Sequence, residues 1–384
     1  MADTYCLRRR TRSAGRAGPF GLGHPPGRKV VLGCLLFLVV PSASVGDIQV
    51  GLDLPAMCER ADLVVVGRAV EVRPDGRATF ADEGASYPGR LVVVTLDVER
   101  LLRGTAGRTL NFTFTVPAVP VIDVGGRAVQ VGEIGVFFLR RDAQGYAVLD
   151  QDYPDVPAWP GRLEAAGSML DRVTAEVVHA LNSPGAPAGV KLHAIRTLAM
   201  IRTPAATAAL KGAVTSPSPD VRLAAASALI TQSHASVLRD VEPVLLSNSS
   251  KIDPQLRDSV GRAIGFGIKD PRAIPLLIPL LASHNVYLRR GAAAALRNTH
   301  DPRALGPLSQ ALYDSDREVR YYAVVGLGEL TRQNQWTPSI ANFDQNEQKF
   351  LKHWRDWAKS LKRVPHAQGQ AATPPASRPA APPR

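Results

Sequence analysis

The 384-residue sequence has only three cysteines, few aromatic residues and no apolar run long enough to cross a membrane as a helix. Aromatic residues make up 6% of the chain, so its cores must be built mainly from Ala, Leu, Val and Ile. Cys6 and Cys34 lie in a predicted leader, and Cys58 alone cannot form an internal disulfide. Packing must therefore stabilise the fold, and we interpret Cys58 as a buried structural thiol.

The sequence also lacks the motifs by which common catalytic and metal sites are recognised. It contains no HExxH, CxxC or GxSxG motif and no Walker-type GxxxxGK. Its eight histidines are scattered, and no two of them have the spacing of metal ligands. We therefore predict that the protein is not an enzyme and that it has no catalytic residue, metal site or cofactor.

Positive charge is concentrated at the two ends of the chain. The formal net charge is +12, of which residues 1–46 carry +6 and residues 361–384 carry +4, which leaves +2 for the body. A nucleic-acid-binding protein would carry its positive charge on a folded face or groove. We therefore predict no nucleic-acid partner.

Residues 1–46 have the organisation of a signal peptide. A long basic stretch precedes an uncharged apolar run over residues 30–40, and the small residues of PSASVG follow that run. Its eleven residues fall short of the roughly 20 that span a bilayer as a helix. We therefore predict an exported protein, periplasmic or extracellular, with an uncleaved membrane anchor as the alternative.

Short runs rich in Val, Leu and Phe follow, separated by clusters of Gly, Pro and Asp. In TLNFTFTV, apolar and polar residues alternate, as in a strand with one buried face. Five such runs predict a small antiparallel β barrel over residues 47–155. The segment from residue 152 to residue 162, with three prolines, is the predicted domain boundary.

Three stretches of this region, CERADLVVVGRAVEV, VTLDVERLLRG and VGEIGVFFLRR, resemble a known family. They are similar to the oligonucleotide/oligosaccharide-binding (OB) barrel of netrin-type modules and tissue inhibitors of metalloproteinases. The resemblance implies an OB-like barrel. Protease inhibition through this barrel is an alternative function, although the inhibitors use a disulfide-held amino-terminal cysteine and Cys58 has no partner.

The second half of the chain contains an internal repeat of just over thirty residues. Small and apolar residues follow each anchor pair after three, six and seven positions, which is the spacing of one helical face. The anchors, an apolar then a basic residue, recur in steps of 31, 35, 32 and 31 residues: Val190-Lys191, Val221-Arg222, Leu256-Arg257, Leu288-Arg289 and Val319-Arg320. The pattern predicts an α-helical solenoid of about five stacked hairpins.

The second helix of the hairpin has its own start signal. Asp270-Pro271 and Asp301-Pro302 each predict an N-cap followed by proline at the first helical position. SDREVRYYAVVGLGEL and HNVYLRRGAAAALRNTHDPRALGPL resemble HEAT repeats, in the short form known as phycobilisome-lyase HEAT-like repeats. The resemblance implies a HEAT-like solenoid over residues 162–362, capping helices included.

The basic residues of the anchors are candidate binding residues because they recur once per repeat. Two interpretations remain open. They pair between repeats with acids such as Asp220, Asp258 and Asp316, or they form a strip that recognises an acidic or extended partner. The candidate interaction surface comprises Arg222, Arg257, Arg289, Arg290, Arg320 and Tyr321.

The last predicted helix, QKFLKHWRDWAKSLKR, is basic and amphipathic. Phe350, Trp354, Trp357 and Leu361 share one face of it. Such a helix can cap the exposed end of the solenoid, or it can contact an anionic membrane surface through residues 349–363. The Pro- and Ala-rich residues 363–384 predict a disordered tail.

These features together predict an exported, two-domain scaffold without enzymatic activity that binds another protein through its repeat surface. A second hypothesis is a bilin or chromophore lyase-like protein, which the resemblance of the repeats implies. Export argues against that hypothesis, since such lyases would meet their substrates in the cytoplasm. Protease inhibition by the barrel is the third.

Overall fold

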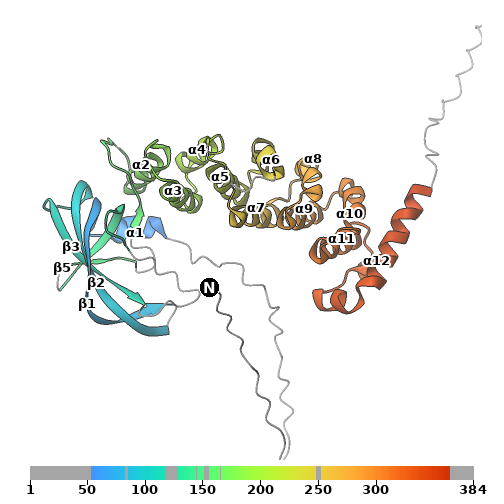
Figure 1. Ribbon diagram of the computed structural model, residues 1–384, viewed down its shortest axis with the longest axis horizontal. Coiled ribbons are helices and arrows are strands. Elements are labelled where there is room, and N and C mark those ends of the chain that lie inside the picture. Colours follow the sequence, from blue (N-terminus) through green and yellow to red (C-terminus); the bar gives the residue numbers. More distant parts are fainter. Residues whose placement is uncertain are drawn as a thin grey trace, which may run out of the picture. The chain divides into compact units, whose positions relative to one another are not determined.

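The computed structural model describes residues 53–82, 85–117, 129–143, 145–150, 155–164, 166–247 and 252–363. The predicted signal peptide over residues 1–46 lies outside these ranges, as does the predicted tail from residue 364 onward. The described chain forms a β sheet followed by a row of helices (Figure 1). None of the described helices combines the length and the apolar character needed to cross a bilayer.

The sheet has six strands and is preceded by a short helix, α1 (Leu54–Arg60). The strands are β1 (Leu63–Asp82), β2 (Ala85–Arg103), β3 (Thr109–Pro117), β4 (Ile134–Asp142), β5 (Gly145–Val148) and β6 (Asp155–Pro157). Neighbours follow the order β1-β2-β3-β5-β4-β6, and β1 also pairs with β4. The strands β1, β2, β3, β5 and β4 therefore form a ring, to which β6 is added through β4.

The sequence pattern explains which strands are buried on one face and which on both. In β3, Leu110, Phe112 and Phe114 are buried in the core of the sheet, as their alternation with polar residues predicts. In β4, every residue from Ile134 to Leu139 is buried. Phe137 packs in the core of the sheet, whereas Phe138 belongs to a second core that continues into the helices. A continuous apolar run therefore marks a strand that is covered on both faces.

Two features of the sheet differ from the prediction of an antiparallel barrel that ends at residue 155. Thr113 of β3 and Ala147 of β5 pair in parallel, whereas the other pairings are antiparallel. Residues 155–157, which were expected at the domain boundary, form β6, and Val156 is buried. The sequence did not reveal β6 because three residues that end in proline are too few to show an alternation.

The second half of the described chain is the predicted row of helical hairpins. Helices α3, α5, α7, α9 and α11 each contain one anchor and contact one another in that order. The helices are α2 (Met169–Asn182), α3 (Ala188–Met200), α4 (Pro204–Ala213), α5 (Pro219–Thr231), α6 (Leu238–Leu246), α7 (Pro254–Gly267), α8 (Ile274–Leu277), α9 (Val286–Asn298), α10 (Leu305–Ala311), α11 (Arg317–Leu330) and α12 (Ile340–Arg363). The predicted solenoid is confirmed in this region.

The predicted starts of the second helices are confirmed as well. The Asp270 carboxylate accepts from the backbone N–H of Arg272 at 2.9 Å, and the Asp301 carboxylate accepts from that of Arg303 at 2.8 Å. The first turn after each cap is a 3₁₀ helix that leads into α8 or α10. The phrase DPRA therefore recurs because it starts the same helix in two repeats.

The β sheet and the first helices share one apolar core. Met57 and Cys58 of α1 and Val136 of β4 lie in the same cluster as Val173 and Val177 of α2. Helix α2 also contacts α1, β2 and β6. The proline-rich segment between the two halves is therefore followed by a packed interface, which the prediction of a boundary there did not include.

A bidentate ion pair crosses this interface. Arg100 of β2 donates from Nε and Nη2 to the Glu176 carboxylate of α2 at 3.0 and 2.6 Å. Its remaining donors reach the carbonyls of Gly161 at 2.6 Å and of Trp159 at 3.2 Å. The Glu176 side chain is 1% exposed and that of Arg100 is 15% exposed, so the pair is removed from solvent. It ties the sheet, the connecting segment and α2 together.

Candidate functional site

The recurring arginines of the anchors hold the turn that precedes their own helix. In three repeats the guanidinium donates to a carbonyl of that turn over 2.8 to 3.0 Å: Arg257 to Ser247, Arg289 to Ser283 and Arg320 to Ser315. Arg289 also forms a bidentate pair with Asp314 of the next repeat, and Arg320 pairs with Glu347 of α12. Arg222 is half-buried at the same position of α5.

These arginines therefore have little surface to offer a partner. The side chains of Arg289 and Arg320 are only 14% and 17% exposed. Arg289 and Arg320 thus pair with an acid of the unit that follows, which is one of the two interpretations that the sequence left open. For these two arginines, the fastening of one unit to the next accounts for the basic residue.

Two further arginines lie on the face of α9 that adjoins α11. Arg290 donates from Nε and Nη2 to the Asp316 carboxylate at 2.9 and 2.7 Å. Arg297 donates in the same way to Glu329 at 2.8 and 2.6 Å. The sequence singled out Arg290 but missed Arg297. A spacing of seven residues, which returns to the same side of a helix, was the signal that could have found it.

The predicted Tyr321 and the neighbouring Tyr322 have different surroundings. The Tyr321 hydroxyl donates to the Pro338 carbonyl at 3.5 Å, and its ring lies 5.4 Å from that of Phe343 of α12. Burial raises the pKa of the Tyr322 hydroxyl, and nearby Glu318 raises it further. Tyr321 therefore contacts the capping helix, and both tyrosines lie near Arg297 and the charged pairs between α9 and α11.

The predicted face of the last helix packs against the end of the repeats. Phe350 and Trp354 are buried in the same core cluster as the repeats, and Trp357 is half-buried against it. The side chain of Leu361 lies outside the described residues. The helix has a kink at Asn346. Phe350 and Trp354 are thus placed as a capping helix requires, and they are not exposed for contact with a membrane surface.

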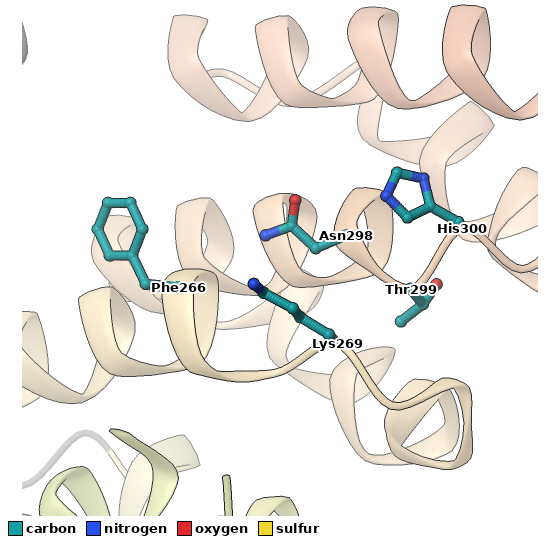
Figure 2. Close-up of a pocket in the computed structure, with 5 residues that line it drawn as sticks. All are labelled: Phe266, Lys269, Asn298, Thr299 and His300. Atoms are coloured by element: carbon teal, nitrogen blue, oxygen red, sulfur yellow. The ribbon is translucent and has the colours of Figure 1, made fainter. Parts of the chain in front are cut away.

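A shallow pocket lies between the carboxyl-terminal ends of α7 and α9 (Figure 2). Its volume is about 490 Å³. Phe266 is 76% exposed, and Lys269 and His300 are exposed as well. Asn298 is half-buried and Thr299 is buried. The pocket therefore combines an open aromatic ring with two basic side chains and an amide.

Glycines bring α7 and α9 close together near this pocket. A Cβ on Gly291 would collide with the Gly261 carbonyl oxygen, and a Cβ on Gly261 would collide with the carbonyl of Tyr287. Asn298 donates from Nδ2 to the Gly265 carbonyl at 2.8 Å. A side chain of α9 thereby satisfies one of the carbonyls that α7 leaves unpaired at its end. This bond fixes the position of Asn298 in the pocket.

The basic side chains of the pocket follow helix ends, where backbone carbonyls concentrate partial negative charge. The acids next to them in sequence are engaged: Asp270 pairs with Arg272 at 2.7 Å, and Asp301 pairs with Arg303 at 2.9 Å. Hydrogen bonds from these arginines lower the pKa of both carboxyls. Within the described part of the chain, no acidic side chain forms an ion pair with Lys269.

The remaining thiol is not available for chemistry. Cys58 is 3% exposed, and burial raises the pKa of its thiol to about 11. The thiolate is the form that attacks electrophiles and binds metals, so a buried thiol of this kind is inert. The described residues also contain no group of three or more His, Cys, Asp or Glu side chains that could hold a metal ion. The inhibitory chemistry of a chelating cysteine therefore finds no support at Cys58.

Comparison with known proteins supports the repeat architecture. Residues 174–252 and 242–328 match the profile of the HEAT repeats family. The match covers the helices from α2 to α11 and stops before α12. The β sheet lies outside it, and its resemblance to an OB barrel is not confirmed.

One curated relative is a bilin biosynthesis protein, MpeU, from Synechococcus sp. strain WH8020. The two sequences are 26% identical over 121 residues, which are 31% of this chain. The aligned part is 41% of the relative, so the chain spans less than half of the length of that protein.

Solved structures with similar helices include designed and natural repeat proteins. The complex of CpcE and CpcF of phycocyanin lyase from Nostoc sp. PCC7120 aligns with 18% identity and a TM-score of 0.35, over 48% of this chain and 72% of that chain. A designed armadillo repeat protein aligns with 18% identity and a TM-score of 0.30, over 47% and 97% of the two chains. With such low scores, the fold assignment rests on the family profile and on the helices themselves.

The prediction that the protein is not an enzyme is contradicted by the curated relative, which is named as a bilin biosynthesis protein. The prediction relied on the absence of a few catalytic motifs, and each of these motifs reports only one class of reaction. Where a bound cofactor or ligand supplies the reactive group, the protein contributes binding and orientation, and no short motif is needed. Residues 174–328 form HEAT-like repeats.

Proposed function

We propose that the protein has a lyase-like role, in which the HEAT-like repeats bind a bilin and the polypeptide that receives it. The observation that carries the proposal is the similarity of 121 residues of this chain to a bilin biosynthesis protein. The repeats also provide a surface for the receiving polypeptide, because stacked hairpins present an extended face on which a polypeptide can lie.

The described side chains support binding and orientation of a pigment by the protein. Cys58 is buried and its thiol has a raised pKa, so it does not compete with an acceptor for the pigment. The face between α9 and α11 carries fixed charges, because Arg290 and Arg297 are each held by a carboxylate. Such side chains, already ordered before binding, lose little freedom when a partner docks.

The proposal is tested with phycocyanobilin as pigment and apo-phycocyanin as acceptor. We expect the full chain to change the absorbance of phycocyanobilin on binding and to increase the rate at which the pigment becomes attached to the acceptor. Attachment is followed by zinc-enhanced fluorescence of the acceptor band on a denaturing gel. A pigment spectrum unchanged by the protein, together with an attachment rate equal to that without protein, would refute the proposal.

We further propose that the protein is exported and that its own acceptor is an exported polypeptide, for which apo-phycocyanin is a substitute in the test above. The basic and apolar organisation of residues 1–46 supports this location. Amino-terminal sequencing of the protein from an envelope fraction tests it, with a start close to residue 47 as the expected result. Recovery of the intact chain in the soluble cytoplasmic fraction would contradict export without affecting the proposed reaction.

For the β domain we infer an OB-like barrel that adds a second contact with the acceptor. Two pairings support this inference: β1 pairs with β4, which closes the strands into a ring, and β3 pairs in parallel with β5. Crosslinking of the acceptor to the full chain provides the test. Crosslinks confined to residues 169–363 would show that the β domain does not contact the acceptor.

A further inference from the structure

Phe266 departs from the pattern of the repeat. Nine residues after the basic residue of each anchor, the five repeats carry Met200, Thr231, Phe266, Asn298 and Glu329. Phe266 alone of these is aromatic, and its ring is 76% exposed. A repeat position that accepts Thr, Asn or Glu does not need an aromatic ring for packing. Packing of the repeats therefore does not explain the aromatic side chain of Phe266.

The surroundings of Phe266 distinguish it from an isolated apolar residue on a surface, which is common and needs no explanation. The ring borders the shallow pocket of about 490 Å³ between α7 and α9. Figure 2 shows Phe266 and His300 at opposite ends of the pocket, with Lys269 and Asn298 between them. The pocket thus offers an apolar surface at one end and polar groups along its length.

We propose that this pocket binds a conjugated, ring-containing molecule that carries a carboxylate. The flat ring system stacks on Phe266, because the edge and the face of an aromatic ring favour offset stacking with another ring. The carboxylate accepts from Lys269, which has no acidic partner within the described residues. Asn298, fixed by its bond to the Gly265 carbonyl, orients the bound molecule between these two contacts.

The inference rests on the proposed function for the identity of the molecule, which would be a bilin. Linear tetrapyrroles combine conjugated rings with carboxylates, the two properties that this pocket selects. The location of the site is independent of that identity. An experiment with matched probes therefore separates the location from the identity.

The test is a titration of the full chain with biliverdin, with biliverdin dimethyl ester and with 8-anilinonaphthalene-1-sulfonate, followed by absorbance or fluorescence. The ester keeps the rings of biliverdin and removes both negative charges. The sulfonate is an aromatic anion without the tetrapyrrole. Phe266→Thr carries the residue of the second repeat at this position, and Lys269→Gln removes only the charge. Ile278→Thr, which removes an exposed apolar side chain directly after α8 and outside the pocket, is the matched control.

We expect Phe266→Thr to weaken biliverdin binding about tenfold, through the loss of the stacking surface. Lys269→Gln weakens it by a similar factor of about ten, through the loss of a charge-assisted hydrogen bond. For the dimethyl ester, Lys269→Gln and the wild-type protein bind equally, since the charge that Lys269 recognises is absent. Ile278→Thr leaves all affinities unchanged.

Each outcome decides between the two proposals. If the wild-type protein binds biliverdin and both pocket variants bind it equally well, the pocket is not the site, and the proposed function stands. If the wild-type protein binds the sulfonate but not biliverdin, and Phe266→Thr loses that binding, the pocket stands and the proposed function fails. Binding of neither probe overturns both. Because Phe266 and Lys269 are exposed, the variants are expected to keep the circular dichroism spectrum and melting temperature of the wild type.

Discussion

Substitution of Arg100 by methionine should loosen the interface between the β sheet and α2. The change removes both hydrogen bonds to Glu176 and leaves a carboxylate that is 1% exposed without its cation. Removing one partner of a buried pair costs about 3–5 kcal/mol, because the charge that stays behind is not solvated. Arg100→Met also removes the bonds to the carbonyls of Gly161 and Trp159. We therefore expect a loss at the upper end of this range.

Glu176→Gln should cost less, although it breaks the same ion pair. The amide oxygen of glutamine can still accept from Arg100, and the two backbone carbonyls continue to bind the guanidinium. Arg100 is also 15% exposed, so water solvates part of its charge. We expect a loss of about 1–2 kcal/mol, the size of one weakened charged hydrogen bond. The order of the two variants is therefore a sharper test than either magnitude alone.

Native-state hydrogen exchange measures this interface locally, which matters because repeat arrays need not unfold in a single step. Peptides from α2 and β2 should lose protection in Arg100→Met, and peptides from α11 should keep theirs. The double variant Arg100→Met with Glu176→Leu should recover much of the loss, since an apolar pair leaves no buried charge. A loss below about 1 kcal/mol in Arg100→Met, or equal losses at α2 and α11, would refute the reasoning.

Three further predictions concern packing and ionisation. Gly291→Ala should lower the free energy of unfolding by about 1–3 kcal/mol, because the added Cβ meets the backbone of α7. Gly306→Ala, which has open space around it, should leave this free energy unchanged or raise it. Equal effects of the two substitutions in thermal unfolding would contradict the close approach of α7 and α9. Burial raises the pKa of the Cys58 thiol to about 11. Alkylation of Cys58 at about pH 8 should therefore be about a hundredfold slower in the folded protein than in urea. Equal rates would show that the thiol is accessible in the folded protein. Burial lowers the pKa of His353, which stacks on Trp336. The unfolded chain therefore binds a proton more readily than the folded protein, and the free energy of unfolding should fall as the pH is lowered from about 8 to about 5. His353→Phe should reduce this fall, and an unchanged pH profile would contradict the reasoning.

The sequence predicted the solenoid because its packing requirement is periodic. The anchors repeat every 31 to 35 residues, and the small residues that follow them stand where neighbouring helices touch. The helix starts at Asp270 and Asp301 were also readable, because a cap depends only on the residues next to it. Each of these features is local or repeated, which makes it visible in one sequence.

The interface between the two halves was not visible for the converse reason. The apolar face of α2, with Val173 and Val177, shows that the helix is buried but not against what. Arg100 and Glu176 are 76 residues apart, and nothing near either residue in the sequence indicates the other. The sequence therefore indicated a leading cap for the solenoid, whereas the helix is the surface on which the β sheet and the repeats are joined.

The candidate site illustrates how a repeat sequence can mislead and how it can inform. Arg289 and Arg320 recur, and they proved to be engaged in fastening one hairpin to the next and the last hairpin to the capping helix. Phe266 does not recur, and its ring is exposed beside a pocket. Selection for packing acts on every repeat and so produces residues that recur, whereas a ligand touches one place and produces residues that do not. In this chain the search for a binding site should therefore begin with the departures from the repeat, and Phe266 is the departure that borders a pocket.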